Sequence, residues 1–368
     1  MTSNQNSETI YHLHQTALKP LLPDSSGQAL IDDYIQIKSI GETRFLNFLH
    51  NQGLAAMWHK TLSSAENTPL ISDNFMESLH RSRLQATGTY MLQSQALKKI
   101  KSTLDNENIN HVVFKGCHIR EVLYDEPAVR PACDIDVLIS PNDQEKTIQA
   151  LVNAGYQFVP NPENISHEAT LFKGDISIDL HWDIMRPGRT RIPMTETLLT
   201  TREEFPNHWG LSNEATLFLM LVHPVFTKYS TTPHASIMRS VDLAYWINQQ
   251  ELNWEQLLNW LEDTGLKTAA WITLKYLQIL TGIMTPRSFS KQIQPRKLTA
   301  SYLSYWIKQN FSSKFLDRPL LIQLAFTLPA HDKLSDAINA VKISLTEKRT
   351  ATLKSSHLAD AIKSVAPK

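Results

Sequence analysis

The spacing of apolar residues changes twice along the chain, and this change restricts the fold more than any other feature of the sequence. From about residue 25 to 105, and again from about 212 onward, apolar side chains recur every three or four positions, which predicts amphipathic helices. Between these regions the apolar runs are short, at 111–115, 134–139 and 176–184, and they are typical of β-strands. The sequence therefore predicts helices, then a unit that contains a sheet, then helices again.

Turn and cap residues divide the middle unit further. A short helix is expected over 116–124, and a second helix begins at Asn142 as its N-cap and ends at Gly155. Gly174 and Asp175 separate two strand-like runs, which predicts a hairpin with a two-residue turn. We expect the pair of strands on either side of this turn to be antiparallel.

The length of 368 residues exceeds a typical single domain, and we predict three parts. These are an N-terminal helical module at 1–105, an α/β core at 106–200 and a C-terminal helical domain at 201–368. Within the last part, the basic segment 284–297 contains two prolines and is expected to be a connector. The final residues, 363–368, are expected to be frayed.

Aspartates recur on one face of the predicted strands. In the run 176–184 the apolar side chains alternate with Ser177, Asp179, His181 and Asp183, so these polar groups share a face. By the same alternation, Asp134 and Asp136 share a face with Leu138. A chain with 18 aspartates in 368 residues contains about one Asp-x-Asp pair by chance, so the surroundings of the pair must decide its meaning. Two neighbouring carboxylates repel each other unless a cation lies between them.

The surroundings supply the other parts of a phosphate site. Lys115 and Gly116 end a predicted strand and open a helix, and a glycine there lets a phosphate approach backbone N–H groups at the helix N-terminus. Carboxylates on adjacent strands, here Asp134, Asp136 and Asp179, can hold two Mg²⁺ ions that bridge a nucleoside triphosphate and an attacking hydroxyl. This set of groups suits in-line nucleotidyl transfer.

In this order the residues resemble a bacterial family of uncharacterised nucleotidyltransferases, a branch of the DNA polymerase β-like nucleotidyltransferase superfamily. The matching residues are Lys115 and Gly116, then Tyr124, Pro127 and Arg130, then Asp134 and Asp136, then Asp179–Trp182. A later segment with His223, Arg239 and Asp242 also looks like the helical part of the family. The resemblance spans most of the chain. It implies an α+β fold, in which a small mixed-sheet nucleotidyltransferase core is flanked by N- and C-terminal helical modules.

The resemblance also implies roles for individual residues. Asp134 and Asp136 would ligate the metal ions, Mg²⁺ or Mn²⁺, and Asp179 would supply the third catalytic carboxylate. The residues that would bind the nucleotide are Lys115, Gly116, Cys117, Arg130 and His181. The superfamily carries serine after the glycine, whereas this chain has Cys117. A thiol is a weak donor, so Lys115 and the backbone amides could hold the triphosphate instead.

Several of these residues also have purely structural interpretations. Arg130 contacts a phosphate or pairs with a carboxylate, and His181 contacts a metal or acceptor or is held by a neighbouring group. Asp183 is most simply a solvated strand end. The arginines of 186–191 grip an anionic acceptor or belong to a solvated loop. His223, Arg239 and Asp242 are expected to form a buried polar network on the later helices.

Charge and cysteine content exclude several classes of protein. Lys+Arg and Asp+Glu are both 36, so a nucleic-acid partner or an anionic membrane is not favoured, although local basic patches remain compatible with this balance. The N-terminus lacks the pattern of a secretory signal, and no apolar run reaches membrane-spanning length, so we expect a cytoplasmic protein. Two cysteines exclude a disulfide framework, and both Cys117 and Cys133 are expected to be reduced and semi-buried.

We therefore expect a metal-dependent enzyme that moves an NMP from an NTP, such as ATP, to a hydroxyl or phosphate and releases pyrophosphate. The acceptor is a small molecule, a peptide or a protein. The alternative is a catalytically inactive relative that binds a nucleotide or a partner. Retention of Asp134, Asp136 and Asp179 favours the enzyme, because loss of a metal ligand is the simplest mark of an inactive copy. The base, the acceptor and the oligomeric state do not follow from the sequence.

Overall fold

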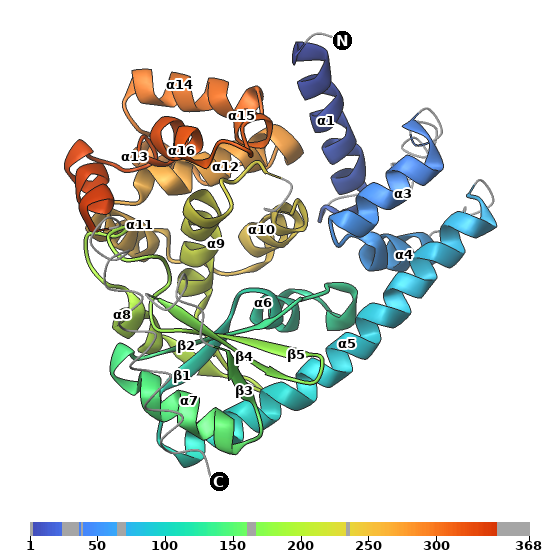
Figure 1. Ribbon diagram of the computed structural model, residues 1–368. Helices are drawn as coiled ribbons and strands as arrows, with labels where there is room; N and C mark the ends of the chain where they lie inside the picture. The colour runs from blue at the N-terminus through green and yellow to red at the C-terminus, as the bar shows by residue number, and fades with distance from the viewer. Residues whose placement is uncertain are drawn as a thin grey trace.

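The predicted α+β architecture is confirmed by the computed structural model of the protein (Figure 1). A five-stranded mixed sheet lies at the centre, and helices precede and follow it in the chain. The structure describes residues 3–23, 37, 40–64, 71–159, 167–232 and 236–343. The predicted frayed end, 363–368, lies outside these residues.

The N-terminal part is helical, as predicted. Its helices are α1 (Ser3–Leu18), α3 (Glu42–Asn51), α4 (Ala55–Ser63) and α5 (Asp73–Asn106). The 34-residue α5 begins at Ser72, whose hydroxyl accepts from the backbone N–H of Phe75 as an N-cap. Figure 1 shows α5 as a long rod that leads from the N-terminal helices to the sheet.

The three predicted strand regions lie in one sheet, as expected. The strands are β1 (His111–Phe114), β2 (Ile135–Ile139), β3 (Gln157–Val159), β4 (Glu168–Lys173) and β5 (Ile176–His181), in the order β1-β2-β5-β4-β3. The pair β2 and β5 is parallel, and the other pairs are antiparallel. The hairpin prediction is confirmed, because Lys173 pairs with Ile176 across a turn in which Gly174 has φ +57°.

Helices α6 (Lys115–Leu123) and α7 (Gln144–Asn153) complete the middle unit. The predicted N-cap of α7 is wrong: Ser140 accepts from the N–H of Asn142 and caps a short 3₁₀ turn, Pro141–Asp143, that precedes the helix. Pro141 explains the difference, because proline favours the first position after a cap. The predicted end is confirmed by Gly155, which has φ +91°.

The C-terminal part is helical again. After α8 (Thr195–Leu199) and a small hairpin of β6 (Arg202–Glu204) and β7 (Trp209–Leu211), the helices are α9 (Asn213–Thr227), α10 (Met238–Gln249), α11 (Trp254–Thr264), α12 (Lys267–Thr281), α13 (Arg287–Ile293), α14 (Lys297–Lys308), α15 (Phe311–Lys314) and α16 (Pro319–Ile322). Residues 334–343 are also helical. Among the described helices none combines the length and apolar character needed to cross a membrane.

The segment 284–297 is not simply a connector, because it contains α13. Phe289 and Ile293, four positions apart, are both buried, and the Phe289 ring lies 4.8 Å from that of Trp254 in α11. The helix follows Pro286 directly and ends before Pro295. The two prolines therefore bound a short helix rather than marking an unstructured link.

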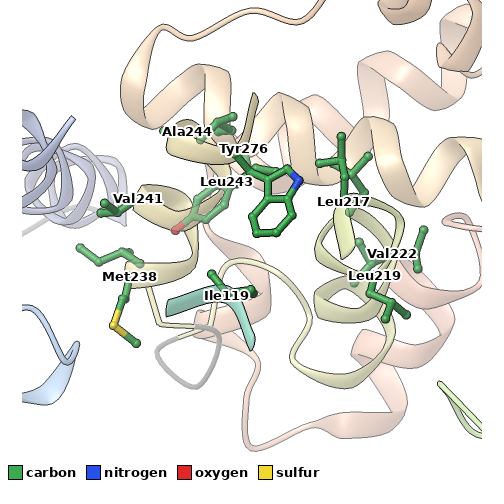
Figure 2. Packing of buried hydrophobic residues seen from close by; sticks show 14 of the residues in the cluster. Ile119, Leu217, Leu219, Val222, Met238, Val241, Leu243, Ala244 and Tyr276 are labelled. Carbon is green, nitrogen blue, oxygen red and sulfur yellow. The ribbon is translucent and has the colours of Figure 1, made fainter. Parts of the chain in front are cut away.

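The two faces of β2 belong to two hydrophobic clusters. Ile135, Val137 and Ile139 pack with apolar residues of α5 and α7 on one face. On the other face, Leu138 belongs to the larger cluster formed with the helical parts. Figure 2 shows part of this larger cluster, where side chains of α6, α9, α10 and α12 meet. The helices α9 and α10 thus belong to the cluster on the face of β2 that carries Asp136. The division at 105/106 and 200/201 stays a prediction.

Candidate active site

Asp136 and Asp179 are direct neighbours on the two parallel strands at the centre of the sheet. Asp136 of β2 is the register partner of Asp179 of β5, and Asp179 in turn pairs with Thr170 of β4. Partners in register share a face, so all three side chains point the same way. The Thr170 hydroxyl donates to Asp179 Oδ1 at 3.1 Å. Asp136 and Asp179 therefore lie on adjacent strands, as expected.

Lys115 reaches Asp136 from the turn between β1 and α6. Its Nζ donates to Asp136 Oδ1 at 2.6 Å, and the same oxygen lies 3.0 Å from His181 Nε2. Burial alone would raise the pKa of Asp136, but the Lys115 charge and the His181 hydrogen bond outweigh it and lower the pKa to about 2. Lys115 has φ +55°, a left-handed conformation that is uncommon for a residue with a side chain. A strained backbone thus places the lysine over the carboxylates.

Asp134 lies just before β2, which begins one residue later than predicted. Burial and the charges of Asp136 and Asp179 raise the pKa of Asp134 to about 6. Burial is the larger cause, and the two like charges add to it because each disfavours ionisation of Asp134. A divalent cation would relieve this repulsion.

The donor atoms suit such a cation. Oxygens of Asp136 and Asp179 and a ring nitrogen of His181 lie within 4.8 Å of one another. Carboxylates favour Mg²⁺ and Mn²⁺, whereas an imidazole is a poor ligand for Mg²⁺ and a better one for transition metals. The three residues whose donor atoms lie close together are thus Asp136, Asp179 and His181. The sequence had suggested Asp134 as the third metal ligand in place of His181.

Sequence reasoning missed Glu168. Its Oε2 lies 3.3 Å from His181 Nδ1, and it is the register partner of His181 in the hairpin. The signal was available, because a two-residue turn at 174–175 aligns residue 168 with residue 181. The strand-like run that precedes Gly174 covers only 169–173, which left this glutamate out.

Arg130 pairs with a carboxylate, one of its two sequence-based interpretations. Its Nη2 donates to Asp242 Oδ2 at 2.7 Å and its Nε lies 3.2 Å from the same oxygen. Tyr124 donates its hydroxyl to Asp242 Oδ1 at 2.8 Å. Burial alone would lower the pKa of Arg130, but Asp242 raises it above the ordinary value. Asp242 is therefore buried and hydrogen-bonded as predicted, but its partners are Arg130 and Tyr124 rather than His223 and Arg239, with which the sequence had grouped it.

Close packing around Gly116 leaves no room for a side chain, whereas the expected approach of a phosphate stays a prediction. A Cβ at this position would lie 2.6 Å from Arg130 Nη1 and 3.1 Å from the Ala132 Cβ. The guanidinium cannot swing aside, because Asp242 holds it and Nη1 also donates to the Pro131 carbonyl at 3.0 Å. The glycine therefore makes room for the buried ion pair.

We expect Gly116→Ala to lower the free energy of unfolding by about 1–3 kcal/mol, the usual cost of overpacking a filled site. Urea unfolding followed by circular dichroism measures the change. Gly88→Ala in α5 is the matched control, because nothing lies within 4 Å of its added Cβ. Replacing a helical glycine by alanine should raise stability by up to about 1 kcal/mol. An unchanged midpoint for Gly116→Ala would show that Arg130 can move.

A cavity of about 670 Å³ extends from these carboxylates toward α9 and α10. Its lining includes the sheet residues Lys115, Asp134, Asp136, Glu168 and Asp179, and, from the opposite side, Met220, His223, Phe226, Tyr229, Met238 and Arg239. The volume falls in the range of small-molecule sites. The cavity is large enough to hold a nucleotide beside the carboxylates.

Four further cations line this cavity. They are Arg186, Arg189, Lys228 and Arg239. Among the residues that the structure describes, no carboxylate lies within ion-pair distance of any of the four. Burial lowers the pKa of His223 well below its usual range, and the nearby charges of Lys115 and Arg239 lower it further. The cavity therefore combines a carboxylate cluster with a strongly positive wall.

The remaining candidates are placed differently. Arg191 is not in the cavity lining and pairs with Asp336 at 2.7 Å.

Cys117 is fully buried, burial raises its pKa to about 12, and its thiol donates to the Asp134 carbonyl. Cys133 is exposed and lines the cavity. Both thiols are free, but neither is semi-buried as expected. Asp183 is half-buried, and its Oδ1 accepts from the Met185 N–H.

Comparison with known families places this arrangement in context. A family model described as uncharacterised nucleotidyltransferase matches residues 38–282. The matched region includes the whole sheet, every residue of the carboxylate cluster and the helices α9 and α10. No curated protein matches the chain.

Proposed function

The chain belongs to the family of uncharacterised nucleotidyltransferases, and from this premise we propose that it transfers an NMP from an NTP to an acceptor hydroxyl or phosphate and releases pyrophosphate. One observation carries the proposal. Asp136 and Asp179 lie in register on adjacent parallel strands, at a cavity that also contains Asp134 and a lysine. The same arrangement supports our placement of the family in the DNA polymerase β-like superfamily.

The charges of the cavity suggest how the substrates would lie. Asp134, Asp136, Asp179 and His181 would hold one or two divalent cations, Mg²⁺ or Mn²⁺. Such a cation, when bound, neutralises the phosphate oxygens and polarises the phosphorus that is attacked. Lys115 contacts Asp136, and Arg239 lies close enough to interact electrostatically with Asp134 and Asp136, so both are suited to the triphosphate. Arg186, Arg189 and Lys228 remain for the acceptor, which suggests that the acceptor is itself anionic.

The proposed transfer is a single displacement at the α-phosphorus. The acceptor oxygen forms a bond to the α-phosphorus while the bond from that phosphorus to the β-phosphate oxygen breaks, and pyrophosphate leaves. The proton of an acceptor hydroxyl must go to a base. Asp179 is suited to accept it, because its carboxylate faces the cavity and only the Thr170 hydroxyl donates to it among the described side chains.

The decisive experiment follows the α-phosphate. Purified protein is incubated with each α-³²P-labelled NTP, with Mg²⁺ or Mn²⁺, and with a native lysate or its small-molecule fraction. We expect label to appear in one class of product with one preferred nucleotide. Asp136→Asn should abolish the product. Binding of a nucleotide without any labelled product under all conditions would favour the inactive nucleotide-binding alternative.

Removal of the metal should weaken nucleotide binding. Without a divalent cation the triphosphate would face Asp134 and Asp136 directly, and like charges repel. Titration of ATP, GTP, CTP and UTP with Mg²⁺ and again with EDTA, followed by calorimetry, tests this. We expect at least about tenfold weaker binding of the preferred nucleotide in EDTA, which is about 1.4 kcal/mol. Equal affinity in both conditions would contradict a carboxylate-held metal.

A further inference from the structure

The region 264–316 contains eight Lys or Arg residues and no Asp or Glu, although the whole chain has zero net charge. These 53 positions include α12, α13 and α14. The balanced composition of the chain therefore hides one strongly basic region. Such a region attracts anions irrespective of the charge elsewhere, because screening in physiological salt limits the reach of a charge to about 8 Å.

Five of these cations line one groove of about 780 Å³ formed by the three helices. The cations are Lys275, Arg287, Lys291, Lys297 and Lys308. Apart from Ala300, the other lining residues are polar or aromatic and include Ser290, Ser301, Ser304, Trp271 and Tyr305. No carboxylate is among the lining residues, and within the described chain none of the five cations lies within ion-pair distance of one. We call this surface the basic groove.

The cations are spread along the groove. In α14, Lys297, Ser301, Ser304 and Lys308 are separated by three or four positions and so share one helical face. At 1.5 Å per residue, Lys297 and Lys308 lie about 16 Å apart along the helix. A single phosphate cannot contact both ends of this row. An extended chain of phosphates can.

Two aromatic side chains at the groove favour single-stranded nucleic acid over extended polyanions that have no bases. Tyr305 is 58% exposed, and Trp271 is half-buried at the same groove. Bases of a single strand stack on exposed aromatic rings while cations follow the backbone. A flat anionic membrane does not fit a concave surface whose cations come from three helices.

We propose that the basic groove binds single-stranded nucleic acid, with its five cations in contact with about five phosphates. The proposal does not depend on nucleotidyl transfer. It differs from our expectation, based on the zero net charge of the chain, that a nucleic-acid partner is not favoured. Helix α12 contributes to the groove and packs against α9, which lines the cavity. A bound strand would therefore lie on the same helical part of the protein as the active site.

The test measures binding of fluorescein-labelled oligo(U) RNA of about 12 nucleotides by anisotropy, with the full chain. Neutralising five phosphates predicts a log–log salt slope of about −3.5, which corresponds to about 10²-fold weaker binding at 200 mM than at 50 mM salt. Lys297→Gln with Lys308→Gln should reduce the slope by about 1.4 and weaken binding at least tenfold at low salt. Lys98→Gln with Lys99→Gln, two exposed lysines of α5, is the charge-matched control and should bind as the wild type does.

Further variants separate nucleic acid from other polyanions. Tyr305→Ala should weaken RNA binding while leaving the salt slope unchanged, because stacking involves no counterion release. Inorganic polyphosphate should compete weakly. The proposal is overturned if RNA does not bind at low salt, or if the groove and control variants bind equally. It is also overturned if polyphosphate or phosphatidylserine vesicles bind more tightly than RNA and Tyr305→Ala has no effect.

Discussion

Asp179→Asn is expected to reduce nucleotidyl transfer by about 10²–10⁴-fold, the scale of general-base catalysis. Asparagine keeps the shape of the side chain and can still accept from Thr170, so the sheet should remain intact. It removes the charge and nearly all of the basicity. Transfer of label from the preferred NTP, compared at equal protein concentration, measures the loss. Binding of NTP with Mg²⁺ should change much less, because Asp134, Asp136 and Lys115 remain.

Asp183→Asn is the matched control for this prediction. Asp183 lies just beyond β5, is half-buried and does not line the cavity. Its replacement should leave transfer within about threefold of the wild type, a difference of about 0.6 kcal/mol, because the carboxylate does not line the cavity. If Asp183→Asn abolished transfer and Asp179→Asn remained active, the third carboxylate would have to be reassigned.

Asp242→Asn should destabilise the protein by about 3–5 kcal/mol, since it leaves the guanidinium of Arg130 buried without a charge partner. Both side chains are almost inaccessible, at 7% for Arg130 and 1% for Asp242. The pair joins the loop before β2 to α10, so its loss should also loosen the cavity wall. Urea unfolding, with the slope checked for constancy, measures the free energy.

The comparison variant is Asp336→Asn, which removes the partner of Arg191 at a more exposed site, where the two side chains are 25% and 15% accessible. It should cost about 0–1 kcal/mol, because solvent screens such a pair. The double variant Arg130→Met with Asp242→Leu should recover part of the stability lost in Asp242→Asn, since it removes both buried charges. Equal losses for Asp242→Asn and Asp336→Asn would contradict the importance of burial.

The sheet could be predicted because its signals are local. Alternation in 176–184 and the two-residue turn at 174–175 together determine the pairing of β4 with β5, and a polar face with Asp179 and His181 follows from it. The parallel pairing of β2 with β5 is not local. The sequence led us to expect only that the two strands are adjacent, since nothing in the two segments alone distinguishes parallel from antiparallel neighbours.

The partners of Arg130 and Gly116 could not be predicted, because these contacts join residues that are distant in the sequence. Asp242 lies 112 positions from Arg130, and only the packing of α10 against α6 brings it there. The steric need for Gly116 depends on that pair in turn. The helix α13 was missed because proline was given more weight than the spacing of Phe289 and Ile293. The four cations of the cavity come from loops and helices whose positions only the fold reveals.

The helix α5 fixes a distance and an angle between two parts of the molecule. Phe75 and Leu79 near its start belong to the helical cluster, whereas Leu97 and Ile100 near its end pack beneath the sheet. Between them one face of the helix is exposed at Leu84, Met91 and Leu92, while the other contacts the segment before β2, where Gln93 donates to the Ala132 carbonyl. One residue inserted there would turn the second half by about 100° relative to the first and carry Leu97 off the sheet. Natural variation in the length of this rod should therefore be rarer than substitution along it.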